Sequence, residues 1–126
     1  MKPSFWLSLA LLLVLIGPSP AQQQTGPDNA LTFEKHVRPI LKANCFQCHG
    51  EGDKLNGKLD VRLRRLIVQG GESGSAITPG KLEDSLLFQR VSKGEMPPGK
   101  KKLTSEEVAI IGRWVAAGAP AARPEP

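Results

Sequence analysis

The chain has 126 residues, and its 17 basic and 12 acidic residues give a formal net charge of +5. This length fits one small domain, and two cysteines are too few for a scaffold held by several disulfides. The charge is only mildly basic, unlike that of a nucleic-acid-binding domain with a dense basic face, so no nucleic acid is expected as a partner.

The first 21 residues have the organisation of a secretory signal. Lys2 is followed by an apolar run of twelve residues from Phe5 to Ile16, and small residues lead up to Ala21. The run is too short to cross a bilayer core of roughly 30 Å as a helix. We predict a signal peptide over 1–21 that is cleaved after Ala21, which places the mature chain in the periplasm or another extracytoplasmic compartment. The alternative is an uncleaved membrane anchor.

The first helix of the mature chain is predicted from Thr32 to Asn44. Its apolar residues recur with the spacing of one helical face, at Phe33, Val37, Ile40 and Leu41. Thr32 is expected to be the N-cap, and Pro39 should kink the helix or break it early. We expect His36 to lie on the exposed polar face.

The segment "NCFQCHG", residues 44–50, holds both cysteines and one of the two histidines. A redox dithiol would place C-x-x-C at the start of a helix that follows a strand, but here a helix comes first and no strand pattern precedes it. A structural zinc site would need four ligands, and the available set, Cys45, Cys48, His49 and His36, is awkward because two of its members are adjacent. A bare disulfide would close a very small loop and leave His49 without a role.

A covalently attached haem c uses all three residues of this motif. Each thiol forms a thioether with a haem vinyl group, and the histidine that follows becomes the proximal iron ligand. Gly50 would let the chain leave close to the porphyrin. Such attachment takes place outside the bacterial cytoplasm, which agrees with the predicted export. We therefore predict one covalent haem c at Cys45 and Cys48, with His49 bound to the iron.

Residues 50–80 are rich in glycine and are predicted to form mostly an ordered loop, with a short helical or extended piece from Val61 to Val68. The arginines of "RLRR", a segment that ends at Arg65, are expected to face solvent, and pairing with the haem propionates is the alternative. A second short helix is predicted over 83–93, capped by Asp84 or Ser85 and ended by Gly94.

Once the signal is removed, Met96 is the one methionine left and His36 the one other histidine. Met96 precedes Pro97 and Pro98, which stiffen the chain, and it lacks the apolar neighbours of a methionine that fills a core. We predict Met96 as the distal iron ligand. His36 as the ligand, or an open sixth position, are the alternatives.

Three consecutive lysines follow this loop: Lys100, Lys101 and Lys102. Such a run is usually a solvated loop, and a docking surface is the second interpretation. If the run lies near an exposed haem edge, its charge would steer an acidic redox partner toward the haem.

The last helix, predicted over 104–117, has the clearest boundary signals. Thr104 and Glu107 form a capping-box pattern at its start. Gly118 followed by Pro120 should end it.

Trp114 of this helix and Phe33 of the first helix are expected to meet in the core where the terminal helices cross, with Gly112 allowing a close approach there. No run of alternating strand residues is present, so the predicted fold is all-α. The predicted domain covers 31–120, with a flexible segment over 22–30 before it and a flexible tail over 121–126 after it.

Several segments together resemble the planctomycete-type cytochrome c domain: "FEKHVRPILKANCFQCHG", "GKLDVR", "GGESGSAITPGKLEDSLLFQRV", "MPPGKKKLTSEE" and "RWVAAGAP". The resemblance covers roughly 31–120 and implies a small class I-like cytochrome c fold wrapped around one covalent haem. It also implies Cys45 and Cys48 as attachment points, His49 as the proximal ligand and Met96 as the distal one. The family often has "LRLD" where this chain reads "KLDVR", and such domains frequently begin much larger proteins.

These observations predict an exported monohaem cytochrome c that carries single electrons and is not an enzyme. Ligation by histidine and methionine would raise its potential relative to ligation by two histidines. The alternatives are a haem enzyme or a gas or redox sensor with an open or labile distal site, and a thiol-disulfide oxidoreductase.

Overall fold

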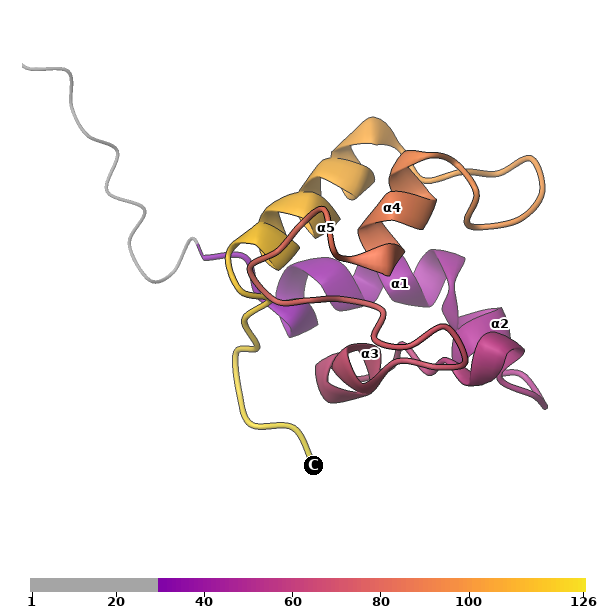
Figure 1. Ribbon diagram of the computed structural model, residues 1–126, viewed down its shortest axis with the longest axis horizontal. Coiled ribbons are helices and arrows are strands. Elements are labelled where there is room, and N and C mark those ends of the chain that lie inside the picture. The colour runs from indigo at the N-terminus through magenta and orange to yellow at the C-terminus, as the bar shows by residue number, and fades with distance from the viewer. Residues whose placement is uncertain (1–29) are drawn as a thin grey trace, which may run out of the picture.

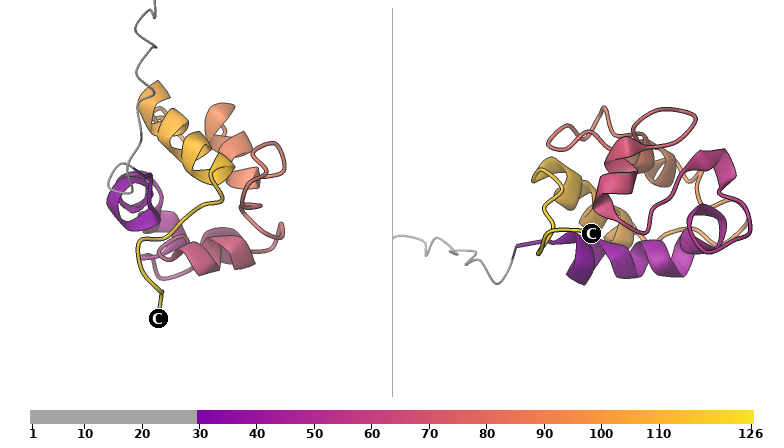
Figure 2. Two further views of the ribbon diagram at one scale, coloured as in Figure 1. Left: turned by 90° about the vertical axis from the view of Figure 1, so that its left-hand side faces the viewer. Right: turned by 90° about the horizontal axis from the view of Figure 1, so that it is seen from below.

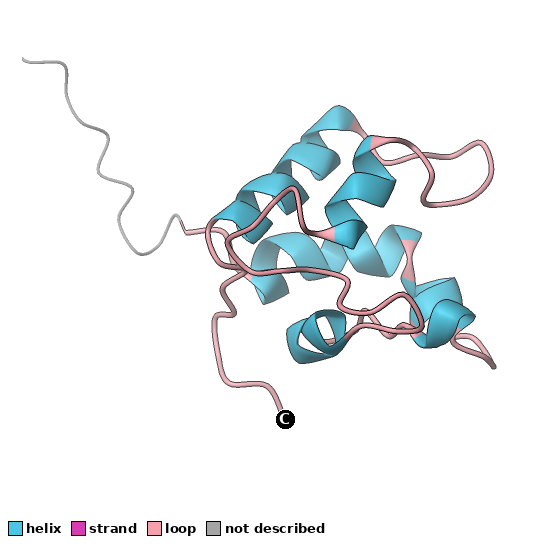
Figure 3. Cartoon of the chain, viewed as in Figure 1, coloured by secondary structure: helices cyan, strands magenta, loops and turns pink. Residues whose placement is uncertain are grey.

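The computed structural model describes residues 30–126, so the predicted signal peptide, its cleavage site and the segment up to residue 29 lie outside the described part. Short helices joined by long loops make up this part (Figure 3). In chain order they are a π-helical turn η2 (Phe33–Val37), α1 (Arg38–Asn44), α2 (Phe46–His49), a 3₁₀ turn η3 (Asn56–Lys58), α3 (Arg64–Gln69), α4 (Leu86–Ser92) and α5 (Ser105–Ala116).

The all-α prediction is confirmed. Within residues 30–126 the β pairing is limited to two isolated bridges, between Gly71 and Gly74 and between Thr78 and Lys81. The short piece predicted between residues 61 and 68 is helical, as α3. No helix in the same range is long and apolar enough to cross a membrane.

The first and last helices cross, and the core forms around their contact (Figure 1). α5 packs against η2 on one side and α4 on the other. Viewed nearly along α1, α5 and α3 lie on the same flank of that helix, one above and one below (Figure 2, left). Phe33 and Trp114 are buried at the crossing, with ring centroids 5.8 Å apart. The predicted contact between these two aromatic residues is confirmed.

The first helix begins irregularly. It changes from a π-helical turn to an α-helix at Arg38, and Pro39 lies in the first turn of α1, where its missing N–H is tolerated. Thr32 occupies the N-cap position, but its hydroxyl does not cap the helix. The backbone N–H of Thr32 instead donates to Nδ1 of His36 at 3.0 Å. His36 is therefore a half-buried local partner of the helix start, not the exposed polar residue we expected.

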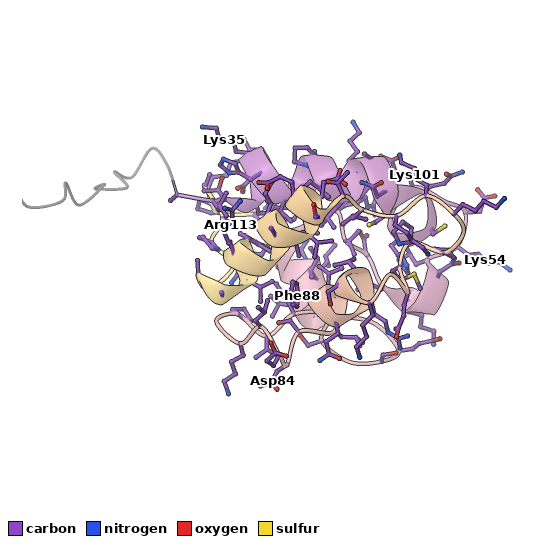
Figure 4. All side chains as sticks on the ribbon, turned by 90° about the horizontal axis from the view of Figure 1, so that it is seen from above. Lys35, Lys54, Asp84, Phe88, Lys101 and Arg113 are labelled. Atoms are coloured by element: carbon purple, nitrogen blue, oxygen red, sulfur yellow. The ribbon has the colours of Figure 1, made fainter. Side chains whose placement is uncertain are left out.

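α4 begins after Ser85, as predicted, and Gly94 follows its end with φ at 70°. The Ser85 hydroxyl turns back to the preceding loop, where it donates to the carbonyl of Lys81 at 2.8 Å. Gly112 does allow a close approach, but to α4: a Cβ built on it would lie 2.8 Å from Cε2 of Phe88, which Figure 4 labels between the two helices. The expected location of this approach, at the crossing with the first helix, is wrong.

Both ends of α5 are capped by the residues predicted from the sequence. The Glu107 N–H donates to Thr104 Oγ1 at 3.2 Å, and the Thr104 N–H donates to the Glu107 carboxylate at 2.8 Å, which completes the capping box. At the other end Gly118 has φ at 94°, and the N–H of Ala119 donates to the carbonyl of Trp114 at 2.8 Å. These two features form a Schellman motif.

Thr104→Ala is expected to lower the free energy of unfolding by about 1 kcal/mol, because it leaves the Glu107 N–H of the first turn without its cap. Ser105→Ala is the matched control, since it removes a hydroxyl from the next, exposed residue, which is not the cap. The two variants would be compared by urea denaturation. Equal losses from both would contradict a capping role for Thr104.

The chain after α5 folds back over the start of the domain. The carbonyl of Pro120 accepts the backbone N–H of Phe33 at 2.9 Å and the indole N–H of Trp114 at 3.0 Å. Residues 121–126, which we predicted to be a flexible tail, make defined contacts with α3. The Glu125 carboxylate accepts the backbone N–H of Arg65, at 2.7 Å, at the start of that helix.

Candidate haem site

A cavity of about 470 Å³ opens between α2, α4 and the loops that follow them, and cofactor-sized groups bind in cavities of this order. All four residues predicted as haem attachment points or ligands line it: Cys45, Cys48, His49 and Met96. In Figure 4 the sulfur atoms gather at the end of the molecule where Lys101 is labelled. His36, the alternative distal ligand, is not among the lining residues. The fold therefore brings the predicted set together and leaves the alternative outside.

The cysteine motif forms a single helical turn. α1 ends at Asn44, and the N–H groups of Cys48 and His49 donate to the carbonyl of Cys45 at 3.2 and 2.9 Å. Residues three and four apart on a helix share a face, so both thiols and the imidazole face the cavity together. Phe46 points the other way and is buried in the core with 1% of its surface exposed. This buried ring anchors the turn and fixes which face meets the cavity.

The backbone of His49 is hydrogen-bonded, while one nitrogen of its imidazole ring has no hydrogen-bond partner among the described residues. Its carbonyl accepts the N–H of Val61 at 2.9 Å, but its Nδ1 atom is buried and has no hydrogen-bond partner among the described residues. A buried polar atom without a partner is destabilising. The unpaired imidazole nitrogen and the two free thiols in one cavity fit a covalently attached haem.

The Cys45 thiol is poorly suited to redox exchange. Burial, with smaller contributions from the nearby Cys48 and Glu107, raises the pKa of this thiol to about 11. The thiol is therefore protonated at neutral pH, whereas a thiol-disulfide oxidoreductase relies on a thiolate with a lowered pKa. The zinc alternative finds no support either, because no group of three or more histidine, cysteine, aspartate or glutamate residues is gathered for a metal within residues 30–126.

The "KLDVR" segment forms one wall of the cavity by simple alternation. Leu59 and Val61 line the cavity, while Asp60 and Arg62 form an ion pair of 2.7 Å outside it. The hydrogen bonds from Arg62 hold the pKa of the Asp60 carboxyl below its usual range. A Cβ built on Gly50 would lie 2.7 Å from Cγ of Arg62, so the tight space at Gly50 is against this arginine and not against the cavity as we expected.

A glycine-lined wall, which sequence reasoning treated only as an ordered loop, faces the motif. Gly57, Gly71 and Gly74 line the cavity. A Cβ built on Gly71 would lie 2.2 Å from the carbonyl oxygen of Gly57, so two loop backbones touch where no side chain fits. The density of glycines in "QGGESG" was the available signal, but it did not indicate which surface the loop would cover.

The Met96 loop is fastened to the end of α4. The backbone N–H groups of Glu95 and Met96 both donate to the carbonyl of Arg90, at 2.9 and 3.1 Å. Pro97 follows through a cis peptide bond, and its carbonyl accepts the Lys102 ammonium at 2.6 Å. Met96 lines the cavity and keeps 38% of its surface exposed. The loop thus holds the thioether at the mouth of the cavity.

The other basic residues considered from the sequence lie outside the cavity. All three consecutive lysines, residues 100–102, are exposed, and none lines the cavity. Arg65 is exposed as expected, and its Nε donates to the carbonyl of Pro126 at 2.8 Å. Because Arg65 is not a lining residue, the structure gives no support to its pairing with a propionate.

Comparison with known proteins gives one positive finding. Neither the search of curated proteins nor the search of solved structures gave a match. The family model described as "Planctomycete cytochrome C" matches residues 45–100, a segment that contains both cysteines, His49 and Met96. This segment also supplies most of the cavity lining. Residues 45–100 therefore match the planctomycete cytochrome c family, as the sequence resemblance predicted.

Proposed function

We propose that this chain is an exported monohaem c-type cytochrome that transfers one electron at a time through a haem ligated by His49 and Met96. The observation that carries the proposal is the convergence of Cys45, Cys48, His49 and Met96 on one cavity, in a chain with a cytochrome c family domain. When bound, a haem c supplies reversible one-electron exchange at its iron. The chain would act as an electron carrier and not as an enzyme.

The residues of the cavity have separate tasks in this proposal. Cys45 and Cys48 fix the cofactor covalently, and the buried Phe46 fixes the orientation of the turn that presents His49. The thioether of Met96 would occupy the sixth iron position and favour the reduced state. The apolar side chains of the walls, Leu87 among them, keep water away from the site.

A redox partner would approach near the Met96 loop. Lys100 and Lys101 are exposed beside this loop, and Lys102 is bonded to it through the Pro97 carbonyl. Figure 4 shows Lys101 at the outer edge of the molecule. We infer that these lysines attract an acidic partner protein, because like-signed clusters accelerate the approach of oppositely charged surfaces.

A second candidate function is favoured by one observation. Met96 keeps 38% of its surface exposed, so its loop is covered on one side only. A haem protein whose distal methionine detaches would bind small ligands at the iron and act as a sensor or enzyme. The absorption band assigned to sulfur-to-iron charge transfer separates the two functions, because it is present only while the methionine is bound.

The protein exported from a host with haem-attachment machinery is expected to have the mass of residues 22–126 plus one haem. The C-x-x-C-H motif supplies two thioether links, and the signal sequence predicts cleavage after Ala21. Intact-mass spectrometry measures both expectations at once, and amino-terminal sequencing should begin at Gln22. Free thiols or a disulfide would contradict the haem. A chain that still carries residues 1–21 would indicate a membrane-tethered cytochrome.

A further inference from the structure

One charged side chain stands out in the cavity. Arg90 of α4 is the one lining residue among the described part of the chain that has a permanent charge. The other polar lining side chains, apart from the predicted attachment points and ligands, are neutral: Asn44, Gln47, Asn56 and Ser73. Arg90 lies at the border of this largely apolar cavity, where its guanidinium can bind an anionic group of a cofactor held inside. A haem brings two propionate carboxylates.

We propose that Arg90 binds a propionate carboxylate of the haem; this inference rests on the proposed function. The guanidinium is planar, remains charged and offers five N–H donors in a fork that matches a carboxylate. Arg65, for which the sequence suggested pairing with a propionate, does not line the cavity.

The ion pair of Arg90 with Glu95 leaves the guanidinium able to bind a propionate. Its NH1 atom lies 2.8 Å from the Glu95 carboxylate, and the two side chains keep 49% and 45% of their surface exposed. An ion pair this exposed contributes little stability. The bond to Glu95 uses one nitrogen of the guanidinium, so the remaining N–H groups can donate to a second carboxylate beside Glu95 or in its place.

Arg90 also connects the cofactor to the distal ligand. Its side chain lines the cavity, while its backbone carbonyl accepts the N–H groups of Glu95 and Met96 at 2.9 and 3.1 Å. A propionate held by the side chain would therefore fix α4 relative to the haem at the residue from which the Met96 loop departs. The positive charge of Arg90 at the cavity would also favour the reduced state of a haem held there.

The test compares the matured holoprotein with its Arg90→Gln, Arg90→Lys and Glu95→Gln variants at one pH and ionic strength. Resonance Raman spectroscopy reports the propionate bending band, and a redox titration reports the reduction potential. Arg90→Gln is expected to shift the band and lower the potential. Arg90→Lys should also shift the band, because lysine lacks the forked N–H donors of the guanidinium. It should lower the reduction potential less than Arg90→Gln does, because lysine keeps the positive charge. Glu95→Gln should leave the band in place.

The outcomes separate this inference from the proposed function. A wild-type protein without covalent haem, by mass, would overturn the proposed function and the inference with it. With haem attached, an unchanged band in Arg90→Gln would overturn the inference alone. So would equal shifts in Arg90→Gln and Glu95→Gln, because Arg90 would then act only as a clamp on the loop. If Arg90→Gln does not mature, the band of Arg90→Lys decides.

Discussion

A chain that carries both Cys45→Ala and Cys48→Ala is expected to contain no covalent haem and to lose its cooperative unfolding transition. The two thiols face the cavity from a single turn, and no other described cysteine can replace them. The longest helix, α5, has 12 residues and the other α-helices have 4 to 7, and helices this short are marginal in water without tertiary packing. A cavity of about 470 Å³ left unfilled removes much of that packing.

Lys42→Ala is the control for this double variant. Lys42 lies on α1 shortly before the motif, is exposed and does not line the cavity, so its loss should leave one haem per chain and a normal transition. Mass spectrometry gives the haem content, and circular dichroism during urea titration gives the transition. A double variant that unfolds as cooperatively as the control would show that the helices pack without the cofactor and would contradict the structural role assigned to it.

Met96→Ala is expected to open the iron to added imidazole or carbon monoxide, to remove the sulfur-to-iron charge-transfer band and to lower the reduction potential. Met96 is the remaining methionine of the mature chain and lines the cavity that holds His49. Without its thioether, the loop after α4 would be held only by its bonds to Arg90 and Lys102. Visible spectroscopy and a redox titration measure these effects.

His36→Ala is the control that distinguishes the two candidate ligands. His36 accepts the backbone N–H of Thr32 and does not line the cavity, so the spectrum should stay as it is. Loss of this cap should lower the free energy of unfolding by about 1 kcal/mol. A spectrum altered by His36→Ala and unaltered by Met96→Ala would indicate ligation by two histidines.

The features that could be predicted from sequence are those in which the residues needed are neighbours in the chain. The capping box of Thr104 and Glu107 spans four positions, and the C-x-x-C-H motif spans five. The meeting of Phe33 and Trp114 followed from two apolar stripes at the ends of one small domain. Met96 was predicted as the distal ligand by elimination, and the fold places it at the cavity; its bond to the iron stays a prediction.

The features that could not be predicted depend on contacts between distant segments. Gly71 meets Gly57 across two loops, and glycine spacing carries no information about such a partner. Arg90 reads as an ordinary surface residue of a short helix, and only the fold shows that it borders the cavity. The role of His36 depends on the irregular start of the first helix, which propensities do not reveal.

The hydrogen bonds to the Pro120 carbonyl determine where a tether or a further domain would join this one. Its carbonyl receives the N–H of Phe33 and the indole of Trp114, so the first and last turns of the domain are pinned at one corner. The cavity is lined by residues of α2 and of the Met96 loop, and these segments lie toward the other end of the domain (Figure 1). A segment joined before the first helix would enter at this corner, and one joined after Pro126 would continue from the tail beside α3. None of residues 120–126 lines the cavity, so the proposed haem face would stay clear of both attachment points.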